Sequence, residues 1–319
     1  MSDDELEPSA VSHSRVEAYQ SCKRKEFYSY SRKLQKKETS LALHLGTTLH
    51  ECLQVLYSHV LSAGPNLDRQ RKIYPEAVLL MWEHVDKLYS EGWEDSEKRA
   101  TLREILEGYL QREPFIDRGW DTDTRQWLIL AVEKEFNFEY DPETKSQYPF
   151  VVDLIAKAPN GRLIVVDHKG LYDFYNEEEE AELKPQIPKY IGALRALGYK
   201  IHSGMYNMLR TRPAPKTKKR TAKEWADTLP VEATVQRITR TMEEQITNAY
   251  ELTVLDELEP EERDRLAVRT AAGTDICKRF CDFRDLCTAE LSGRSTAIML
   301  KSRFEPKKKR DKIEVSEEA

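Results

Sequence analysis

The chain has 319 residues, of which 33% are charged and 39% hydrophobic, and its formal net charge at pH 7 is −6. This composition is typical of a soluble, highly charged globular protein with a core of its own, and it argues against a generally basic nucleic-acid coat. The longest apolar runs are far too short for a membrane span and no secretory signal opens the sequence, so we expect a cytoplasmic protein with no membrane-embedded part.

The first part of the chain has the pattern of helices. Residues 1–10 are acidic and aperiodic, which predicts a disordered tail. Ser14 is a candidate N-cap for a helix that continues through Tyr19 and Phe27 to Tyr30. Apolar residues at helical spacing predict three further helices, over residues 46–62, 72–91 and 96–113.

The hydrophobic period changes near residue 127. Residues 127–138 predict a strand, and residues 149–169 predict a hairpin whose turn is Pro159-Asn160-Gly161. The remaining elements expected are a helix after Pro185 with Pro188 in its first turn, a strand over 200–210 and a helix over 232–254. The order of these elements predicts an α/β core with a helical insertion before it.

The hairpin predicts a group of charged residues on one face of the sheet. If its turn is a three-residue loop, Ala158 pairs with Arg162, and Asp153 lies directly opposite Asp167. Lys169, two residues after Asp167, points to the same face. Directly opposed carboxylates destabilise a sheet unless a cation lies between them, and oxygen ligands favour Mg²⁺ or Mn²⁺. The alternative is a hairpin with a solvated polar edge and an incidental lysine.

The chain has five cysteines, three of which form the pattern C-x3-C-x5-C at Cys277, Cys281 and Cys287. In an intracellular chain such a cluster favours metal binding over disulfides. The three thiolates could hold zinc with one distant ligand, or an iron–sulfur cluster with a fourth cysteine, for which Cys22 is the candidate. Reduced structural cysteines are the remaining alternative, and Cys52 is interpreted as an ordinary buried thiol.

Basic residues gather in three segments, within residues 23–37, 210–220 and 307–310. The first two are candidates either for contacts with nucleic-acid phosphates or for solvated loops. The third is interpreted as a solvated tail.

These motifs, taken in chain order, resemble the RecB-like branch of the PD-(D/E)xK nuclease superfamily, specifically its iron–sulfur exonucleases. That group includes the small nuclease of CRISPR spacer acquisition, the nuclease domain of AddB-type helicase–nucleases and phage exonucleases. The resemblance covers about residues 11–295. The matching positions are Ser14, Cys22 and Phe27-Tyr28, then Gly46-Thr47-Thr48-Leu49-His50, Asp153, Asp167-His168-Lys169, Gln186-Ile187-Pro188-Lys189-Tyr190, and finally Cys277, Cys281 and Cys287. Two departures are His168 inside the Asp-x-Lys motif and Gly170-Leu171 after it, where the family often has Thr-Gly.

The resemblance implies a restriction-endonuclease-like α/β core, with a mixed central sheet flanked by helices, a helical insertion and a C-terminal iron–sulfur region. It implies a single domain over 11–295, followed by a flexible charged tail over 296–319. The implied function is a metal-dependent DNA exonuclease of DNA repair, recombination or phage replication. Single strands or DNA ends are its implied substrates, and the comparison allows a helicase or recombination partner. The alternative is a catalytically silent nuclease-fold scaffold that binds DNA within a larger complex.

The resemblance also implies roles for individual residues. The implied ligands of Mg²⁺ or Mn²⁺ are His50, Asp153, Asp167 and a glutamate of the preceding strand, for which Glu133 is favoured over Glu135. Lys169 would orient the attacking water and stabilise developing negative charge. Gln186 and Tyr190, four residues apart on one helix face, would contact the nucleic acid or steady Lys169. Cys22 and the terminal cysteine triplet would hold a [4Fe-4S] cluster.

Overall fold

A computed structural model describes residues 10–37, 41–90, 96–112, 115, 127–174, 181–215, 217, 220–275, 277–278 and 281–307. The described residues form two compact units, a larger one within residues 40–136 and 151–242, and a smaller one within residues 10–37, 137–150 and 243–307. Strands β2 (Leu128–Asp141) and β3 (Ser146–Lys157) and helix α9 (Val235–Asp256) contribute residues to both units. The single domain expected over residues 11–295 stays a prediction.

A mixed five-stranded sheet has the strand order β2-β3-β4-β5-β6. Strand β4 (Leu163–Leu171) pairs antiparallel with β3 and parallel with β5 (Ile201–Arg210), and β5 pairs antiparallel with β6 (Ala226–Val231). The short helix α8 (Ala222–Trp225) precedes β6. The α/β core with a mixed sheet is therefore confirmed, and β6 is a strand that the sequence did not predict.

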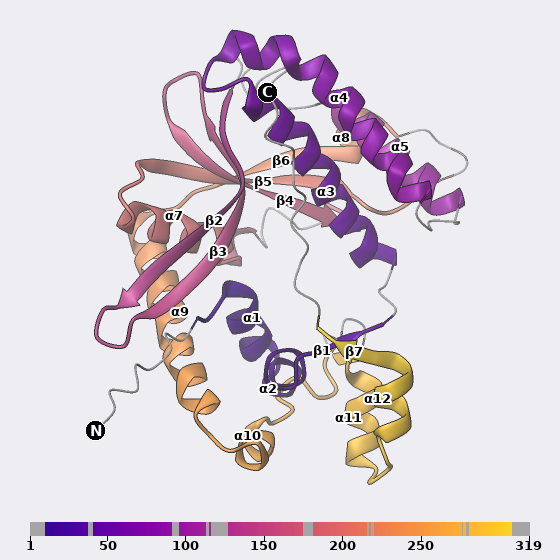
Figure 1. Ribbon diagram of the computed structural model, residues 1–319, viewed down its shortest axis with the longest axis vertical. Helices are drawn as coiled ribbons and strands as arrows, with labels where there is room; N and C mark the ends of the chain where they lie inside the picture. The colour runs from indigo at the N-terminus through magenta and orange to yellow at the C-terminus, as the bar shows by residue number, and fades with distance from the viewer. Residues whose placement is uncertain are drawn as a thin grey trace. The chain divides into compact units, whose positions relative to one another are not determined.

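Helices of the larger unit cover both faces of the sheet (Figure 1). Helices α3 (Leu41–Ser62), α4 (Leu67–Ser90) and α5 (Ser96–Leu110) share one core with the sheet, to which they contribute Leu49, Leu53, Leu56, Met81, Ile105 and Leu106. Met205 of β5 belongs to that core, whereas a Cβ on the adjacent Gly204 would meet Ile187 of α7 (Gln186–Ala196). Because neighbouring strand residues point to opposite faces, α7 packs on the face away from α3.

The turn between β3 and β4 is the predicted three-residue loop. The N–H of Ala158 donates to the carbonyl of Arg162 over 2.8 Å, and the side chain of Asn160 accepts from the N–H of Arg162 over 3.0 Å. Gly161 has a φ of 81°, a left-handed conformation that glycine adopts without a steric penalty. This turn sets the register of the hairpin that carries the charged residues.

The smaller unit consists of short elements. They are α1 (His13–Ser21), α2 (Lys23–Glu26), the π-helical turn η1 (Phe27–Ser31), β1 (Leu34–Lys36), α10 (Pro260–Leu266), α11 (Arg284–Leu291), α12 (Ala297–Arg303) and β7 (Phe304–Pro306). Strands β1 and β7 pair antiparallel. A compact core of Phe27, Tyr28, Ala267, Phe283, Leu286 and Phe304 joins the N-terminal and C-terminal elements of this unit.

The first helix differs from its prediction at both ends. Ser12, not Ser14, caps it, since the Ser12 side chain accepts from the N–H of Arg15. The helix also ends at Cys22, which has an extended backbone with φ −164° and ψ 113°. The side chain of Cys22 therefore projects from the break between α1 and α2, and not from the surface of a helix.

The C-terminal segment also differs from its prediction. A flexible tail was expected from residue 296, but α12 and β7 occupy residues 297–306, because β7 pairs with β1 and Phe304 stacks on Phe283 at 5.5 Å. Residues 308–319 lie outside the described residues, as do residues 1–9 of the predicted N-terminal tail.

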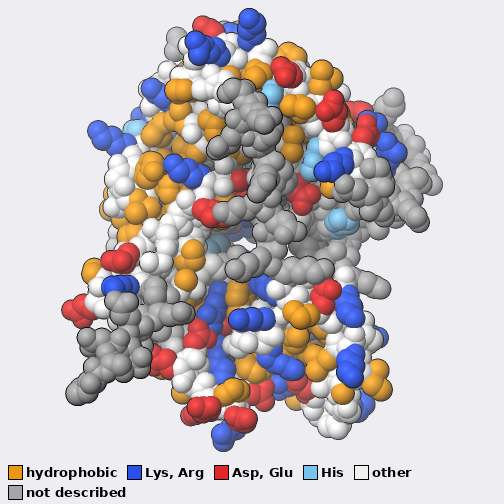
Figure 2. Space-filling model, viewed as in Figure 1, with side chains coloured by type: hydrophobic (Ala, Val, Ile, Leu, Met, Phe, Trp, Pro, Cys, Tyr) orange, Lys and Arg blue, Asp and Glu red, His pale blue; other side chains and the backbone are white. Residues whose placement is uncertain are grey.

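Charges of both signs lie side by side on the surface. On the face drawn in Figure 2, Lys and Arg side chains are interspersed with Asp and Glu. Arg24, from the first basic segment, is buried and bonds Asp264 and Glu290 at 2.6 and 2.5 Å, so it supports the fold of the smaller unit. Within the described part of the chain, no helix combines the length and the hydropathy needed to cross a membrane.

Candidate metal centre and cysteine pocket

Two aspartates of the hairpin face each other in the larger unit. Leu154 pairs with Val166, and Asp153 and Asp167 are the next residues of the two strands beyond this pair. Both carboxylates are buried, with 9% and 3% of the residue exposed. The sheet therefore holds two acidic groups close together away from bulk water, an arrangement that is costly unless cations or donors compensate it.

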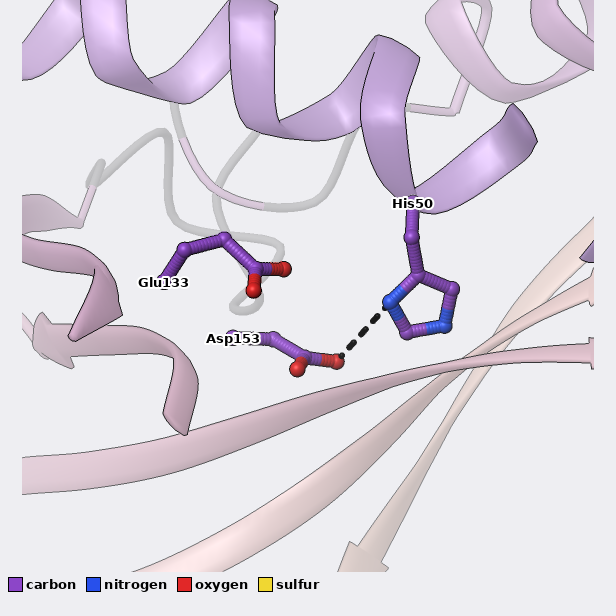
Figure 3. A group of neighbouring side chains, drawn as sticks. All are labelled: His50, Glu133 and Asp153. Atoms are coloured by element: carbon purple, nitrogen blue, oxygen red, sulfur yellow. Dashed lines mark ion pairs between the residues drawn. The ribbon is translucent and has the colours of Figure 1, made fainter. Parts of the chain in front are cut away.

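Three side chains from three elements, one of which is Asp153, converge in the larger unit (Figure 3). His50 of α3, Glu133 of β2 and Asp153 of β3 each offer a ligand atom, and these atoms lie within 4.8 Å of one another. The Nδ1 atom of His50 lies 3.4 Å from Oδ2 of Asp153 and is buried without a hydrogen-bond partner among the described residues. One imidazole nitrogen and carboxylate oxygens form a donor set that suits Mg²⁺ or Mn²⁺.

Glu133 reaches this group through an irregularity in β2. Its φ is 43°, a left-handed value that is unusual for a non-glycine residue in a strand. Ile129 and Ala131 are buried before it and Phe136 after it, so the inward-facing positions change from odd to even numbers at this point. A β-bulge has this effect, and it separates the half-buried Glu133 from the exposed Glu135. The structure thus groups Glu133, not Glu135, with His50 and Asp153.

The surroundings of Asp153 raise its pKa to about 6. Burial is the largest cause and the charge of Asp167 adds to it, whereas His50, the N–H of His168 and Lys169 oppose it. The N–H of His168 donates to Oδ2 of Asp153 over 2.7 Å. Without a cation, this carboxyl group therefore holds a proton at a higher pH than an ordinary aspartate does.

Lys169 and Asp167 form an ion pair that an amide holds in place. Nζ of Lys169 lies 2.8 Å from Oδ2 of Asp167 and donates to Oε1 of Gln186 over 2.7 Å. Nε2 of Gln186 donates to Oδ1 of Asp167 over 2.7 Å and to the hydroxyl of Tyr190 over 3.0 Å. Burial and the charge of Asp167 raise the pKa of Tyr190, which keeps its hydroxyl protonated. The structure thus brings together all four residues that the sequence expected here.

His168 points to the opposite side of β4, into the α3 core. It is buried, its ring stacks on Tyr57 at 5.9 Å, and the Asn207 amide lies 2.8 Å from its Nδ1. Burial and the charges of His50 and Lys169 lower its pKa well below the usual range, so the ring is neutral. Asn207 also bonds the hydroxyl of Tyr109 over 3.1 Å. The sequence did not predict this network of His168, Asn207 and Tyr109, because no local pattern links residues so far apart in the chain.

Gly170, near the end of β4, lets the backbone of α3 come close to that strand. A Cβ on Gly170 would lie 3.0 Å from the Cα of Gly46, closer than two such atoms normally approach. His50 follows Gly46 by four residues, about one helical turn. The contact between the two backbones therefore sets how near the imidazole comes to the hairpin.

The smaller unit contains a separate site made of cysteines. Cys22, at the break after α1, and Cys277, Cys281 and Cys287 line one cavity of about 270 Å³. Burial raises the pKa of the Cys22 thiol, but hydrogen bonds from the backbone of Ala271, Lys25 and Arg24 and from Thr270 outweigh it, and the net shift is downward. Burial raises the pKa of the Cys281 and Cys287 thiols, so the donors favour the thiolate at Cys22 and not at these two residues. Clustered cysteine sulfurs are the ligands that suit a soft metal or an iron–sulfur cluster. Cys52 is buried in the core of the larger unit, as expected for an ordinary thiol.

A hydrogen-bond network supports one wall of this cysteine pocket. Glu290 accepts from Arg24, Tyr28 and Arg269 over 2.5, 2.5 and 2.8 Å. The thiol of Cys287 lies 3.9 Å from the hydroxyl of Tyr28. The network ties α2 and η1, which follow Cys22, to α11, which contains Cys287.

Comparison with known proteins bears on the family of the chain. A family model described as the PD-(D/E)XK nuclease superfamily matches residues 10–288. No curated protein matches the chain.

Proposed function

The chain belongs to the PD-(D/E)XK nuclease superfamily, and we propose that it is a divalent-metal-dependent deoxyribonuclease that degrades DNA as an exonuclease. One observation carries this proposal: the ligand atoms of His50, Glu133 and Asp153 converge within 4.8 Å, beside the ion pair of Asp167 and Lys169. The buried Nδ1 of His50, which has no hydrogen-bond partner among the described residues, and the raised pKa of Asp153 support a cation as the missing component of this group.

We propose that His50, Glu133 and Asp153 hold Mg²⁺ or Mn²⁺, with Asp167 as a further ligand. When bound, such a cation polarises the scissile phosphate and lowers the pKa of a water molecule. Lys169 offers its ammonium group at the same edge, where it orients the nucleophile and stabilises negative charge that develops on the phosphate. Gln186 and Tyr190 keep Lys169 in this position.

In the smaller unit we propose a [4Fe-4S] cluster held by Cys22, Cys277, Cys281 and Cys287. The lining of one cavity by these residues supports it, and zinc is the competing occupant. A cluster here would join the break after α1 to the C-terminal elements of the same unit. Its role would be to stabilise the fold of this unit as a clamp between Cys22 and the C-terminal cysteines, because it closes a very long loop of the chain.

The biological setting of the nuclease follows from the resemblance of its motifs to iron–sulfur exonucleases. We propose a role in DNA repair, recombination or phage replication, with single strands or DNA ends as substrates. A helicase or recombination partner stays a prediction of that resemblance.

The test is hydrolysis of end-labelled single- and double-stranded DNA and of circular single-stranded DNA, in Mn²⁺, Mg²⁺ or EDTA. Lys169→Ala is compared with Lys157→Ala, which removes an exposed lysine at the turn end of the same hairpin. We expect metal-dependent degradation of linear DNA that Lys169→Ala abolishes and Lys157→Ala preserves. Resistance of the circle would support the exonuclease mode, and its cleavage would show an endonuclease. A folded, metal-loaded protein that cleaves none of these substrates would be a DNA-binding scaffold instead.

A further inference from the structure

Three arginines lie on aromatic rings where the parallel strands β4 and β5 end. The guanidinium groups of Arg210, Arg212 and Arg220 lie 4.5, 5.5 and 4.5 Å from the ring centres of Phe174, Tyr172 and Trp225, respectively. Leu171, the last residue of β4, pairs with Arg210, the last residue of β5. The cluster therefore begins at the edge of the sheet to which Lys169 belongs.

Among the described residues, Asp173 is the acidic side chain that contacts these guanidinium groups. Asp173 bonds Arg210 at 2.6 Å and lies 3.4 Å from Arg212. Arg220 donates to the backbone carbonyls of Arg212 and Pro213 and is thereby held beside the other two arginines. Within the part of the chain that the structure describes, one aspartate thus contacts two of three neighbouring cations.

The neighbouring arginines also affect the pKa of Arg220, which is lower than that of an ordinary arginine. Burial lowers its pKa most, and the charges of Arg210 and Arg212 lower it further, against the raising effects of Glu224 and Asp173. Among the described residues, Arg210 and Arg212 thus place positive charge close to Arg220, an arrangement that favours an anion.

Tyr172 adds an exposed aromatic surface to this positive group. It follows Lys169 by three residues, roughly 10 Å along an extended chain, and 62% of it is exposed. The side chain of Arg212 beside it is 48% exposed. An exposed ring next to accessible guanidinium groups is the combination with which proteins hold single-stranded nucleic acid.

We propose that Tyr172, Arg212 and Arg220 form a subsite for one unpaired nucleotide of the substrate strand. The base stacks on the ring of Tyr172, and the neighbouring phosphate contacts Arg212 and Arg220. Stacking on a side chain requires a free base face, which a continuous duplex does not offer. The subsite rests on the proposed function only in taking DNA as the ligand. It selects an unpaired strand one to a few nucleotides from Lys169.

The first experiment measures binding of a short fluorescein-labelled oligothymidylate to the full chain by fluorescence anisotropy, in EDTA so that no hydrolysis occurs. Tyr172→Ala should raise Kd about tenfold, whereas Tyr172→Phe, which keeps the ring, should stay within about twofold. Tyr199→Ala is the matched control, because Tyr199 is a partly exposed tyrosine elsewhere in the same unit, packed on Phe136. Its affinity should equal that of the wild type.

A second pair of variants separates phosphate contact from general charge. Arg212→Ala should weaken binding and reduce the slope of log Kd against log salt by about 1. Arg162→Ala removes an exposed arginine at the turn end of β4 and should leave the slope unchanged. An oligonucleotide of abasic sites should bind wild type and Tyr172→Ala equally, because only the base stacks.

Wild-type affinity of Tyr172→Ala, or an equal loss on abasic DNA, would overturn the subsite. So would an unchanged salt slope in Arg212→Ala. If Tyr172→Ala lost as much affinity for a blunt duplex as for the single strand, the claim that the subsite takes an unpaired nucleotide would be overturned. Hydrolysis is read separately, so an inactive protein with Tyr172-dependent binding would refute the nuclease and leave the subsite standing.

Discussion

The ammonium group of Lys169 donates a hydrogen bond to the side-chain oxygen of Gln186 over 2.7 Å. The other end of the same amide donates to Asp167 over 2.7 Å. The amide oxygen thus faces the ammonium group of Lys169 and the amide nitrogen faces the carboxylate of Asp167. Only one of the two orientations of the amide satisfies both charged groups. Gln186 begins α7, so the first turn of that helix positions the lysine of the hairpin.

Replacing Gln186 with Ala should lower kcat about 10- to 100-fold, because two bonds to charged groups are lost. KM for DNA should change little if Gln186 acts by positioning Lys169. Tyr190→Phe removes only a neutral partner of the amide and should cost about fivefold. Steady-state hydrolysis in Mn²⁺ distinguishes the two variants. A loss confined to KM in Gln186→Ala would show that this residue contacts DNA instead.

The bulge in β2 predicts different roles for two glutamates that are two residues apart. Glu133→Gln should weaken Mn²⁺ binding about tenfold or more, since it removes a charged ligand. Glu135→Gln, at an exposed position of the same strand, should bind Mn²⁺ like the wild type. Isothermal titration with Mn²⁺ measures both. Equal losses in the two variants would rule out the selective role of Glu133.

The left-handed backbone of Glu133 predicts that the substitution Glu133→Gly raises the stability of the protein while it weakens metal binding. A non-glycine residue in this conformation costs about 1 kcal/mol, so Glu133→Gly should relieve strain while removing the ligand. We expect its Tm in EDTA to exceed that of Glu133→Ala by a few degrees, with Mn²⁺ binding equally weak in both. Thermal unfolding followed by circular dichroism provides the measurement. A lower Tm for the glycine variant would mean that the bulge stores no strain.

The raised pKa of Asp153 predicts a pH dependence of metal binding. An ordinary aspartate has a pKa of about 3.9, and in the folded, metal-free protein that of Asp153 is about 6. Between these values the folded state binds more protons than the unfolded state. The contribution of Asp153 to stability therefore falls as pH rises through this window.

A bound cation must displace the proton of Asp153, so affinity for Mn²⁺ should rise from pH 5 to about pH 6 and then depend less on Asp153. Asp153→Asn should bind weakly and lose this part of the pH dependence. Titrations with Mn²⁺ at several pH values test it. The same slope in wild type and Asp153→Asn would contradict the assignment.

The cysteine pocket predicts that iron and stability are lost together. Protein purified without oxygen should contain about four irons per chain, and Cys281→Ala should lose the iron and become unstable or insoluble. Cys52→Ala removes a buried thiol outside the pocket and should keep its iron. Elemental analysis and thermal unfolding give the two readouts. One zinc per chain would replace the cluster by a zinc site, and wild-type-like stability of iron-free Cys281→Ala would refute the clamp.

Local patterns were sufficient for the hairpin. Asn160 and Gly161 specify the turn, and period-two alternation then places Asp153, Asp167 and Lys169, because strand pairing propagates from the turn without further information. The choice between Glu133 and Glu135 did not follow, since the two share a face on a regular strand. The positive φ of Glu133 makes the strand irregular at this residue, and this irregularity distinguishes the two glutamates.

Other elements escaped prediction for identifiable reasons. Strand β6 contains Pro230, which argues against a strand except at the edge of a sheet, where β6 lies. Strands β1 and β7 are three residues each and form only because the chain brings Leu34 opposite Pro306. Such pairing depends on contacts distant in sequence and leaves no periodic signal.

The contact between Gly46 and Gly170 has a consequence for which cation the site selects. A methyl group at Gly170 would act as a spacer between α3 and the hairpin and would move His50 away from Asp153. Mg²⁺ tolerates little change in its ligand distances, whereas Ca²⁺ accepts longer and more variable ones. The missing side chain of Gly170 thus keeps His50 close to Asp153, and this spacing limits the radius of the cation that the site would accept.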